Sequence, residues 1–206
     1  MLSHVAAIVI PRLLAMMSRG QVNCSREEIG AVADAWAKPL SVPGVPNLFE
    51  VNKDLYRSGQ PTAAGFRNLG AMGIRSCVSL RAHRNDRNDA RGVAVLCVWR
   101  PILGRSVSDE DIEELILDMR YRLPRPVLLH CYHGADRTGL LCAAYRMLIE
   151  NWTVEEAVRE MVLGGFGYHQ VYHPYVTILQ KLDVEAMRAR LKRFAADNGL
   201  NDPERS

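Results

Sequence analysis

Short apolar runs alternate with amphipathic stretches along most of this 206-residue chain. Apolar runs of strand length lie at residues 74–80, 93–98 and 126–129, and residues 48–56 have the pattern of a strand or hairpin. Stretches with the start and stop signals of helices lie at residues 61–72, 108–122, 140–149, 153–165 and 174–193. Strands that alternate with helices predict an α/β fold with a mainly parallel central sheet flanked by helices on both faces.

The two ends of the chain carry weaker patterns than its middle. Residues 1–46 are expected to form an N-terminal extension, and the three prolines between residues 39 and 46 make its last part a stiff connector. We expect one main domain over residues 47–185, because 206 residues are too few for two ordinary domains. The end of the last helix and a tail would occupy residues 186–206.

Composition narrows the class of protein. The chain has 48% hydrophobic and 24% charged residues and a formal net charge of +3, which is typical of a globular protein. It has no polybasic run interleaved with aromatic residues, so we expect no nucleic-acid partner. The apolar run Val5–Ile10 is too short to cross a membrane. We expect no stable membrane span and a cytoplasmic location, with export through an atypical N-terminal signal as the open alternative.

The cysteines and histidines do not form a recognisable framework. The five cysteines are odd in number and three lie in apolar runs, so a disulfide-built fold is not expected. His130, Cys131 and His133 lie close together in the sequence, but no second ligand pair has the spacing of a zinc site. We therefore expect neither a metal site nor a cofactor.

The most informative segment of the chain is residues 130–139, with the sequence HCYHGADRTG. It lies between an apolar strand-like run and a helix-like run, which places the thiol of Cys131 at the positive N-terminal end of a helix. Such an end favours both a thiolate and a bound phosphate. Arg137, six residues later, has a planar guanidinium that can bind two phosphate oxygens at once. The alternative, a buried strand cysteine before an ordinary turn, does not explain this combination of residues.

The spacing His-Cys-x5-Arg-Thr-Gly resembles the signature of the cysteine-dependent protein tyrosine phosphatases. Residues 55–61, LYRSGQP, are similar to the start of the dual-specificity-type phosphatases of bacteria, fungi and plants, and residues 164–169, GGFGYH, to a segment of the bacterial members. The resemblance covers about residues 47–183 and leaves residues 1–40 without a match. It implies a dual-specificity-phosphatase-like fold and a hydrolase that works through a phosphocysteine intermediate.

The motif predicts a role for each of its residues. Cys131 would be the nucleophile, because a helix N-terminus and a nearby cation lower the pKa of a thiol. His130 would orient the loop and support the thiolate, and Thr138 would donate to the sulfur to ease its departure. The alternatives are a histidine that simply ends a strand and a threonine that bonds its own backbone. The phosphate oxygens would be bound by the arginine and the loop N–H groups, that is, by Tyr132, His133, Gly134, Ala135, Asp136 and Arg137.

The general acid is where this chain departs from its relatives. Many dual-specificity phosphatases carry an aspartate on a loop about thirty residues before the cysteine, but residues 93–105 contain no acidic residue. Lipid phosphatases of the myotubularin and Sac types resemble this chain in having an aspartate just before the arginine. We therefore expect Asp136 to supply the proton or to share it with solvent. The alternatives are Asp109 or Asp111, or no dedicated acid.

These observations together predict a phosphatase that hydrolyses phosphotyrosine or acts with dual specificity. Its partner would be a phosphorylated protein or a small phosphomonoester. A phosphoinositide or inositol-polyphosphate phosphatase and a weakly active module that binds phosphorylated ligands are the alternatives. A rhodanese-like sulfur transferase is disfavoured by the Arg-Thr-Gly end of the motif. Around the entrance, Tyr132 and Trp99 could wall an aryl pocket, with plain packing as the alternative. The basic loop with Arg81, His83, Arg84 and Arg87 is interpreted as a solvated turn, with a place at the entrance as the alternative.

Overall fold

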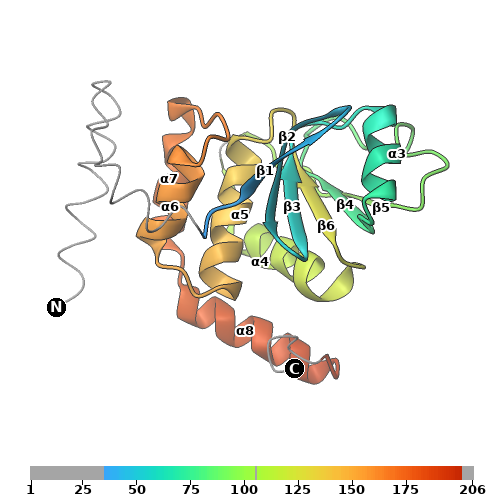
Figure 1. The fold of residues 1–206 in the computed structure, drawn as a ribbon. Coiled ribbons are helices and arrows are strands. Elements are labelled where there is room, and N and C mark those ends of the chain that lie inside the picture. Colours follow the sequence, from blue (N-terminus) through green and yellow to red (C-terminus); the bar gives the residue numbers. More distant parts are fainter. Residues whose placement is uncertain (1–34, 105, 201–206) are drawn as a thin grey trace.

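The computed structural model describes residues 35–104 and 106–200, which form a central sheet with helices on both of its faces (Figure 1). The sheet has the strand order β1-β2-β3-β6-β4-β5. Strands β1 to β3 are antiparallel to one another, and β3, β6, β4 and β5 are parallel. The predicted α/β class is therefore confirmed. The strands are β1 (Lys38–Val42), β2 (Val45–Asn52), β3 (Leu55–Ser58), β4 (Ser76–Ser79), β5 (Leu96–Trp99) and β6 (Val127–His130).

Two hydrophobic clusters bury the two faces of the sheet. Leu128 of β6 and Cys77 of β4 face the smaller cluster, which includes Phe66 of α3. Val127 and Leu129 point the other way, into the larger cluster. Figure 1 shows α3 on one side of the sheet and the remaining helices on the other. The helices are α3 (Ala63–Ala71), α4 (Asp109–Leu117), α5 (Asp136–Ile149), α6 (Val154–Leu163), α7 (His173–Lys181) and α8 (Val184–Asp197), with a π-helical turn at Asp118–Arg122 and a 3-10 turn at Gln170–Tyr172.

The central strand β6 positions the motif found in the sequence. Its residues are buried on both faces, which explains the uninterrupted apolar run before His130. His130 lies level with Ser58 at the end of β3 and with Ser79 at the end of β4. Cys131 therefore leaves the sheet at the carboxyl edge of three parallel strands, where α/β folds bind their ligands.

The helix signals in the sequence are confirmed at three N-termini. The Thr62 side chain accepts from the N–H of Gly65 and caps α3. Ser108 and Thr153 each form a complete capping box, at α4 and α6 respectively. These local side-chain bonds satisfy backbone donors that have no partner within the helix.

Two expectations from the sequence are corrected. Residues 39–46 are not a connector, because β1 and the start of β2 form an antiparallel pair there and Asn47 lies inside β2. Pro39 is tolerated in β1 because this strand is at the edge of the sheet. The single last helix expected over residues 174–193 is two helices, because Leu182 is extended and Asp183 caps α8 through the N–H of Ala186.

No helix in the described part of the chain is both long and apolar enough to cross a membrane. The cytoplasmic location stays a prediction from the sequence. Most of the expected N-terminal extension, and the end of the expected tail, lie outside the described residues.

Candidate active site

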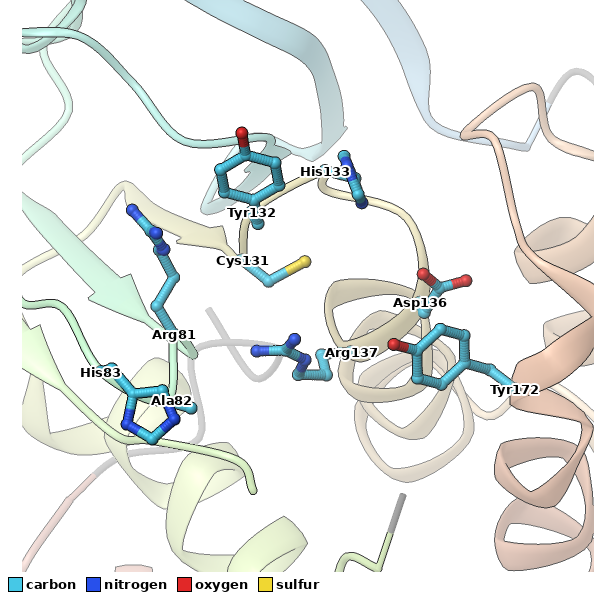
Figure 2. Close-up of a pocket in the computed structure, with 9 residues that line it drawn as sticks. All are labelled: Arg81, Ala82, His83, Cys131, Tyr132, His133, Asp136, Arg137 and Tyr172. Atoms are coloured by element: carbon cyan, nitrogen blue, oxygen red, sulfur yellow. The ribbon is translucent and has the colours of Figure 1, made fainter. Parts of the chain in front are cut away.

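The loop from Cys131 to Arg137, here called the Cys131 loop, connects β6 to α5 (Figure 2). The Cys131 side chain is buried, and its Sγ accepts a hydrogen bond from the N–H of Gly134 at 3.3 Å. Helix α5 begins at Asp136, four residues earlier than the apolar pattern indicated, and no side chain caps it. Its first-turn N–H groups can therefore bind an anion beside the sulfur.

A cavity of about 300 Å³ lies over the Cys131 loop. Figure 2 shows the sulfur of Cys131 and the guanidinium of Arg137 on the same cavity. Arg137 is half-buried, and its Nη1 donates to the carbonyl oxygen of Leu80 at 3.3 Å, which tethers one edge of the group. A cavity of this size admits a phosphate and part of its alcohol. Its walls are made by Arg81, Ala82, His83, Cys131, Tyr132, His133, Asp136, Arg137 and Tyr172.

Gly134 allows the Cys131 loop to lie against the end of β3. Its backbone has a φ of +75°, a conformation that residues with a Cβ rarely adopt. A Cβ at this position would lie 2.4 Å from the carbonyl carbon of Ser58 and 2.5 Å from the nitrogen of Gly59. The glycine is therefore required both by conformation and by space.

Arg57 of β3 supports the Cys131 loop through its backbone carbonyl groups, a role that was not predicted from the sequence. It is 1% exposed, and its Nη2 donates to the carbonyl oxygens of Gly134 and Ala135 at 2.8 and 3.3 Å. The ring of Phe166 lies 3.6 Å from the guanidinium carbon. Burial lowers the pKa of Arg57, but an arginine pKa is so high that the side chain stays charged. The available signal was its place in the LYRSGQP segment that resembles the phosphatases.

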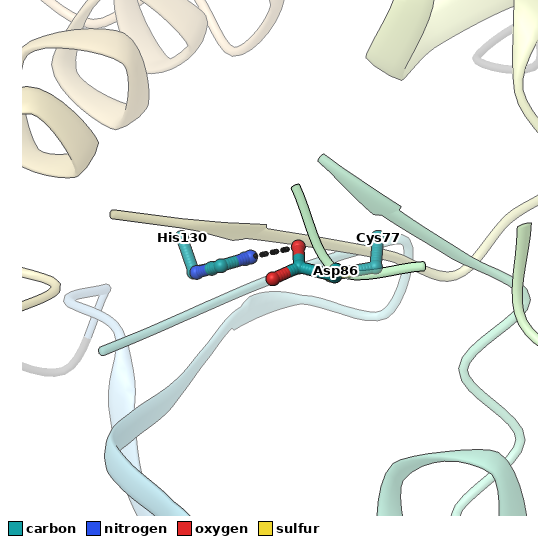
Figure 3. A group of neighbouring side chains, drawn as sticks. All are labelled: Cys77, Asp86 and His130. Carbon is teal, nitrogen blue, oxygen red and sulfur yellow. Dashed lines mark hydrogen bonds and ion pairs between the residues drawn. The ribbon is translucent and has the colours of Figure 1, made fainter. Parts of the chain in front are cut away.

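His130 is completely buried between two oxygen acceptors, of which Figure 3 shows the Asp86 carboxylate. Its Nε2 lies 2.8 Å from Oδ2 of Asp86, and its Nδ1 lies 3.1 Å from the carbonyl oxygen of Cys131. Asp86 also accepts from Nε2 of Gln60 at 2.9 Å. Burial by itself would raise the pKa of Asp86, but the hydrogen bonds and charge of His130 and the bond from Gln60 bring it below its ordinary value. Nothing in the polar loop sequence distinguished Asp86 from its acidic neighbours.

Cys77 joins Asp86 and His130 in a buried group. The atoms that could bind a metal ion, namely the cysteine sulfur, a carboxylate oxygen and a ring nitrogen, lie within 4.8 Å of one another. Burial raises the pKa of the Cys77 thiol well above its usual range, so it carries its proton at neutral pH. Asp86 and His130 already bind each other directly, which accounts for their proximity. The absence of a metal stays a prediction.

The candidate general acid Asp136 lies on the cavity wall but is bound to a residue that the sequence did not single out. Its Oδ1 accepts from the backbone N–H of His169 at 2.8 Å, and its Oδ2 lies 2.9 Å from Nδ1 of the same residue. Asp109 and Asp111 lie in the first turn of α4, as predicted, and neither is among the cavity-lining residues. The Asp111 carboxylate bonds Ser108 in the capping box.

Thr138 follows Arg137 in the first turn of α5. Its hydroxyl is buried and has no hydrogen-bond partner among the described residues. The predicted bond from this hydroxyl to the sulfur is therefore not formed in this structure, although the hydroxyl is free to make it.

The entrance residues divide into two groups. Arg81 and His83 line the cavity, so for these two residues the alternative of a place at the entrance is confirmed. Arg84 instead forms a surface ion pair with Asp89 at 2.5 Å. Tyr132 is 57% exposed and forms a wall of the cavity, as the sequence suggested. The remaining two, Arg87 and Trp99, line a separate cavity of about 270 Å³, and Tyr172 is a wall residue that the sequence analysis missed.

Comparison with known proteins finds a matching family model and similar phosphatases. A family model described as a DSP-PTPase phosphatase fused to NAD+ kinase matches residues 47–172. The chain is 30% identical over 172 residues to the dual specificity protein phosphatase TpbA of Pseudomonas aeruginosa, which covers 83% of this chain and 75% of TpbA. It is also 29% identical over 154 residues to the inositol diphosphatase DSP2 of Oryza sativa, covering 68% of this chain and 74% of the relative.

Solved structures show the same similarity in three dimensions. The crystal structure of P. aeruginosa TpbA has a TM-score of 0.69 and 28% identity and covers 77% of this chain and 97% of its own. A cysteine-to-serine variant of TpbA in complex with phosphotyrosine has a TM-score of 0.68 and 27% identity, with coverage of 77% and 96%. The core catalytic domain of the PP-IP phosphatase SIW14 of S. cerevisiae shares the fold at a TM-score of 0.65 and 21% identity, again with coverage of 77% and 96%.

Proposed function

This chain belongs to the DSP-PTPase phosphatase family and is a cysteine-dependent hydrolase of phosphomonoesters, and from that premise we propose that Cys131 forms the phosphocysteine intermediate. The observation that carries the proposal is the position of its sulfur, at the start of α5 and on one cavity with the Arg137 guanidinium. The helix N-terminus and the guanidinium both favour the thiolate over the thiol. They also provide donors for the three equatorial oxygens of the transferred phosphoryl group.

The reaction then has two steps. The thiolate of Cys131 attacks phosphorus, an S–P bond forms, the P–O bond to the leaving group breaks, and a proton reaches the leaving oxygen. Water attacks phosphorus in the second step, the S–P bond breaks, and the water proton returns to the acid. The unpaired hydroxyl of Thr138 would donate to the departing sulfur and lower the barrier of this second step.

The proton donor in this proposal is the pair of Asp136 and His169. Asp136 lines the cavity, its Oδ1 accepts from the backbone N–H of His169, and its Oδ2 lies within hydrogen-bond distance of Nδ1 of the same residue. The pair holds the transferable proton between Nδ1 and Oδ2, so it can pass a proton to the leaving oxygen and recover one from water. Asp111 is engaged at the capping box and takes no part in this scheme.

Aryl phosphates, and phosphotyrosine above all, are the proposed substrates. Tyr132 and Tyr172 provide aromatic walls on the cavity, and the Arg81 guanidinium lies 5.1 Å from the ring centre of Tyr132. The complex of the TpbA variant with phosphotyrosine supports this choice. A second candidate is an inositol diphosphate, as in the rice relative, because Arg81 and His83 place further basic groups beside Arg137.

Phosphate release from a small aryl phosphate in the presence of EDTA tests the mechanism. Wild type should be active, Cys131→Ser should have no activity, and the buried Cys142→Ser should keep most of it as a matched control. Activity that survives in Cys131→Ser contradicts the proposal, and a folded but inactive wild type favours the phosphate-binding module.

A substrate panel then separates the two substrate classes. Arg81→Ala is expected to impair an inositol diphosphate more than a phosphotyrosine peptide, because the polyanion needs the additional cation. Wild-type rates on the two substrates decide which of them the cavity favours. A phosphotyrosine peptide that is hydrolysed no faster than an alkyl phosphate would contradict the aryl preference.

A further inference from the structure

A chain of hydrogen bonds, part-buried at Arg81 and Gln60 and buried at Asp86 and His130, connects the cavity wall to the backbone of the nucleophile. Arg81 donates to Oε1 of Gln60 at 2.9 Å, and Gln60 donates to Oδ1 of Asp86 at 2.9 Å. Asp86 then binds Nε2 of His130, and Nδ1 of this ring faces the Cys131 carbonyl oxygen. Asp86 comes from the loop after β4, far from the motif in sequence, so its part in this chain depends on the fold.

Each ring nitrogen of His130 faces an oxygen atom. A neutral imidazole has one N–H and one lone pair, so it would direct a lone pair at one of the two oxygens. A ring protonated at both nitrogens donates to the Asp86 carboxylate and to the Cys131 carbonyl at once. His130 and Asp86 are 0% and 2% exposed, so water has little access to replace either contact. The lowered pKa of Asp86 agrees with a carboxylate at this position.

We propose that Asp86 is a positioning residue of the phosphatase reaction: it holds His130 as an imidazolium, whose charge stabilises the Cys131 thiolate. The inference rests on the proposed role of Cys131 as nucleophile. The imidazolium contacts the backbone of Cys131 itself, whereas the Asp86 carboxylate lies on the far side of the ring. The sulfur is therefore closer to the positive member of the pair than to the negative one, and the pair favours the thiolate.

Other titratable groups also surround the Cys131 sulfur and the pair of His130 and Asp86. Burial is the main reason that the pKa of Tyr175 is raised to about 12, and burial also keeps Cys77 protonated, so both are neutral at pH 7. The negative charge of Asp86 adds to the effect of burial on the pKa of Cys77, but burial is the larger cause, so Cys77 keeps its proton without that charge as well. The charged and titratable groups that face the centre are Arg57 from β3, Cys77 from β4, Arg81 after β4, Arg137 and Asp136 from α5, and Tyr175 from α7.

The substitution Asp86→Asn tests the charge while it keeps the shape. An asparagine amide can donate to Nε2 of a neutral His130 and accept from Gln60, so the network stays intact and only its charges disappear. The pH midpoint of Cys131 alkylation by iodoacetamide, followed by mass spectrometry of the peptide that contains Cys131, should rise by about one pH unit. Asp89→Asn, in the same loop but paired with Arg84 at the surface, should leave this midpoint unchanged.

The effect of Asp86→Asn on the alkylation midpoint of Cys131, measured in a His130→Asn variant, separates a role through His130 from a purely structural role. In His130→Asn the midpoint should rise, and adding Asp86→Asn should now lower it, because Asp86 is then only a negative charge near the sulfur. An unchanged midpoint in Asp86→Asn, or a further rise in the double variant, would overturn the proposal. If circular dichroism shows that Asp86→Asn does not fold, an unchanged midpoint in His130→Asn would overturn it equally.

Alkylation needs no substrate, so the two proposals fail separately. A low midpoint in a wild type that releases no phosphate contradicts the proposed function alone. Normal phosphate release combined with an unmoved midpoint in Asp86→Asn contradicts the role of Asp86 alone.

Discussion

The guanidinium of Arg57 lies beneath the Cys131 loop and donates a 2.8 Å hydrogen bond to the carbonyl oxygen of Gly134. Because these two residues are 77 positions apart, the bond ties β3 to the loop that carries the nucleophile. Of the loop carbonyl groups, those of Gly134 and Ala135 point towards this cation. A buried charge thus shapes the anion site without contacting the substrate.

Arg57→Met should destabilise the protein and slow its hydrolysis of phosphate esters. The substitution removes the Arg57 donor from the buried carbonyl oxygen of Gly134, which costs about 1–3 kcal/mol of the free energy of unfolding, whereas Ala135 keeps its bond from the N–H of Gly139. The loop should also lose its alignment, so kcat/KM for an aryl phosphate should fall. Urea unfolding and initial rates measure both effects. Arg190→Met is the control, because Arg190 forms an exposed ion pair with Glu113 and should leave stability nearly unchanged. Equal effects of the two substitutions would contradict the supporting role of Arg57.

Gly134→Ala should abolish most of the activity, whereas Gly165→Ala should not. Both glycines have a positive φ, of +75° and +81°, so both alanines carry the same backbone strain of about 1 kcal/mol. Only at Gly134 would the new Cβ meet backbone atoms, at 2.4–2.5 Å, while Gly165 has open space. A displaced loop should cost about 100-fold in kcat. Measuring kcat for both variants, with thermal unfolding to check that each is folded, tests this prediction. Similar losses of kcat in the two variants would mean that backbone strain alone accounts for the effect.

Asp136→Asn should slow the enzyme in a way that depends on the leaving group. A general acid contributes about 10²–10⁴-fold to the rate for a poor leaving group and much less for a good one. The loss should therefore be large on an alkyl phosphate and small on an activated aryl phosphate, and His169→Gln should follow the same trend. Asp111→Asn, which changes only a helix cap, should show no such dependence. An Asp136→Asn variant that is unchanged on both substrates would remove the pair as proton donor.

The free energy of unfolding at low pH should reveal the lowered pKa of the Asp86 carboxyl group. Its pKa is lower in the folded protein than the ordinary aspartate value of about 3.9, so its contribution to the free energy of unfolding is complete above that value and is lost as the pH falls towards the folded pKa. The stability difference between wild type and Asp86→Asn should therefore shrink as the pH falls from about 5 to below about 4. Urea unfolding at a series of pH values measures it. A difference that stays constant to pH 3 would contradict the lowered pKa.

The amino-acid sequence by itself determined those features that arise from neighbouring residues. The apolar run of β6, the capping boxes at Ser108 and Thr153, and the HCx5RTG motif are local, so periodicity and spacing were enough to predict them. The strand β1 was missed because three prolines suggested a connector, and only pairing with β2 makes residues 38–42 a strand. The break between α7 and α8 was missed because the apolar pattern continues across Leu182.

Only the tertiary structure decided which distant residues complete the site. Asp86 meets His130 across 44 residues, His169 meets Asp136 across 33, and Arg57 meets Gly134 across 77. A lone aspartate in a polar loop or a lone arginine in a short strand carries no local signal of such a partner. Their roles arise when parallel strands end at one edge and bury polar groups there, because each buried charge must then find its counterpart within the fold.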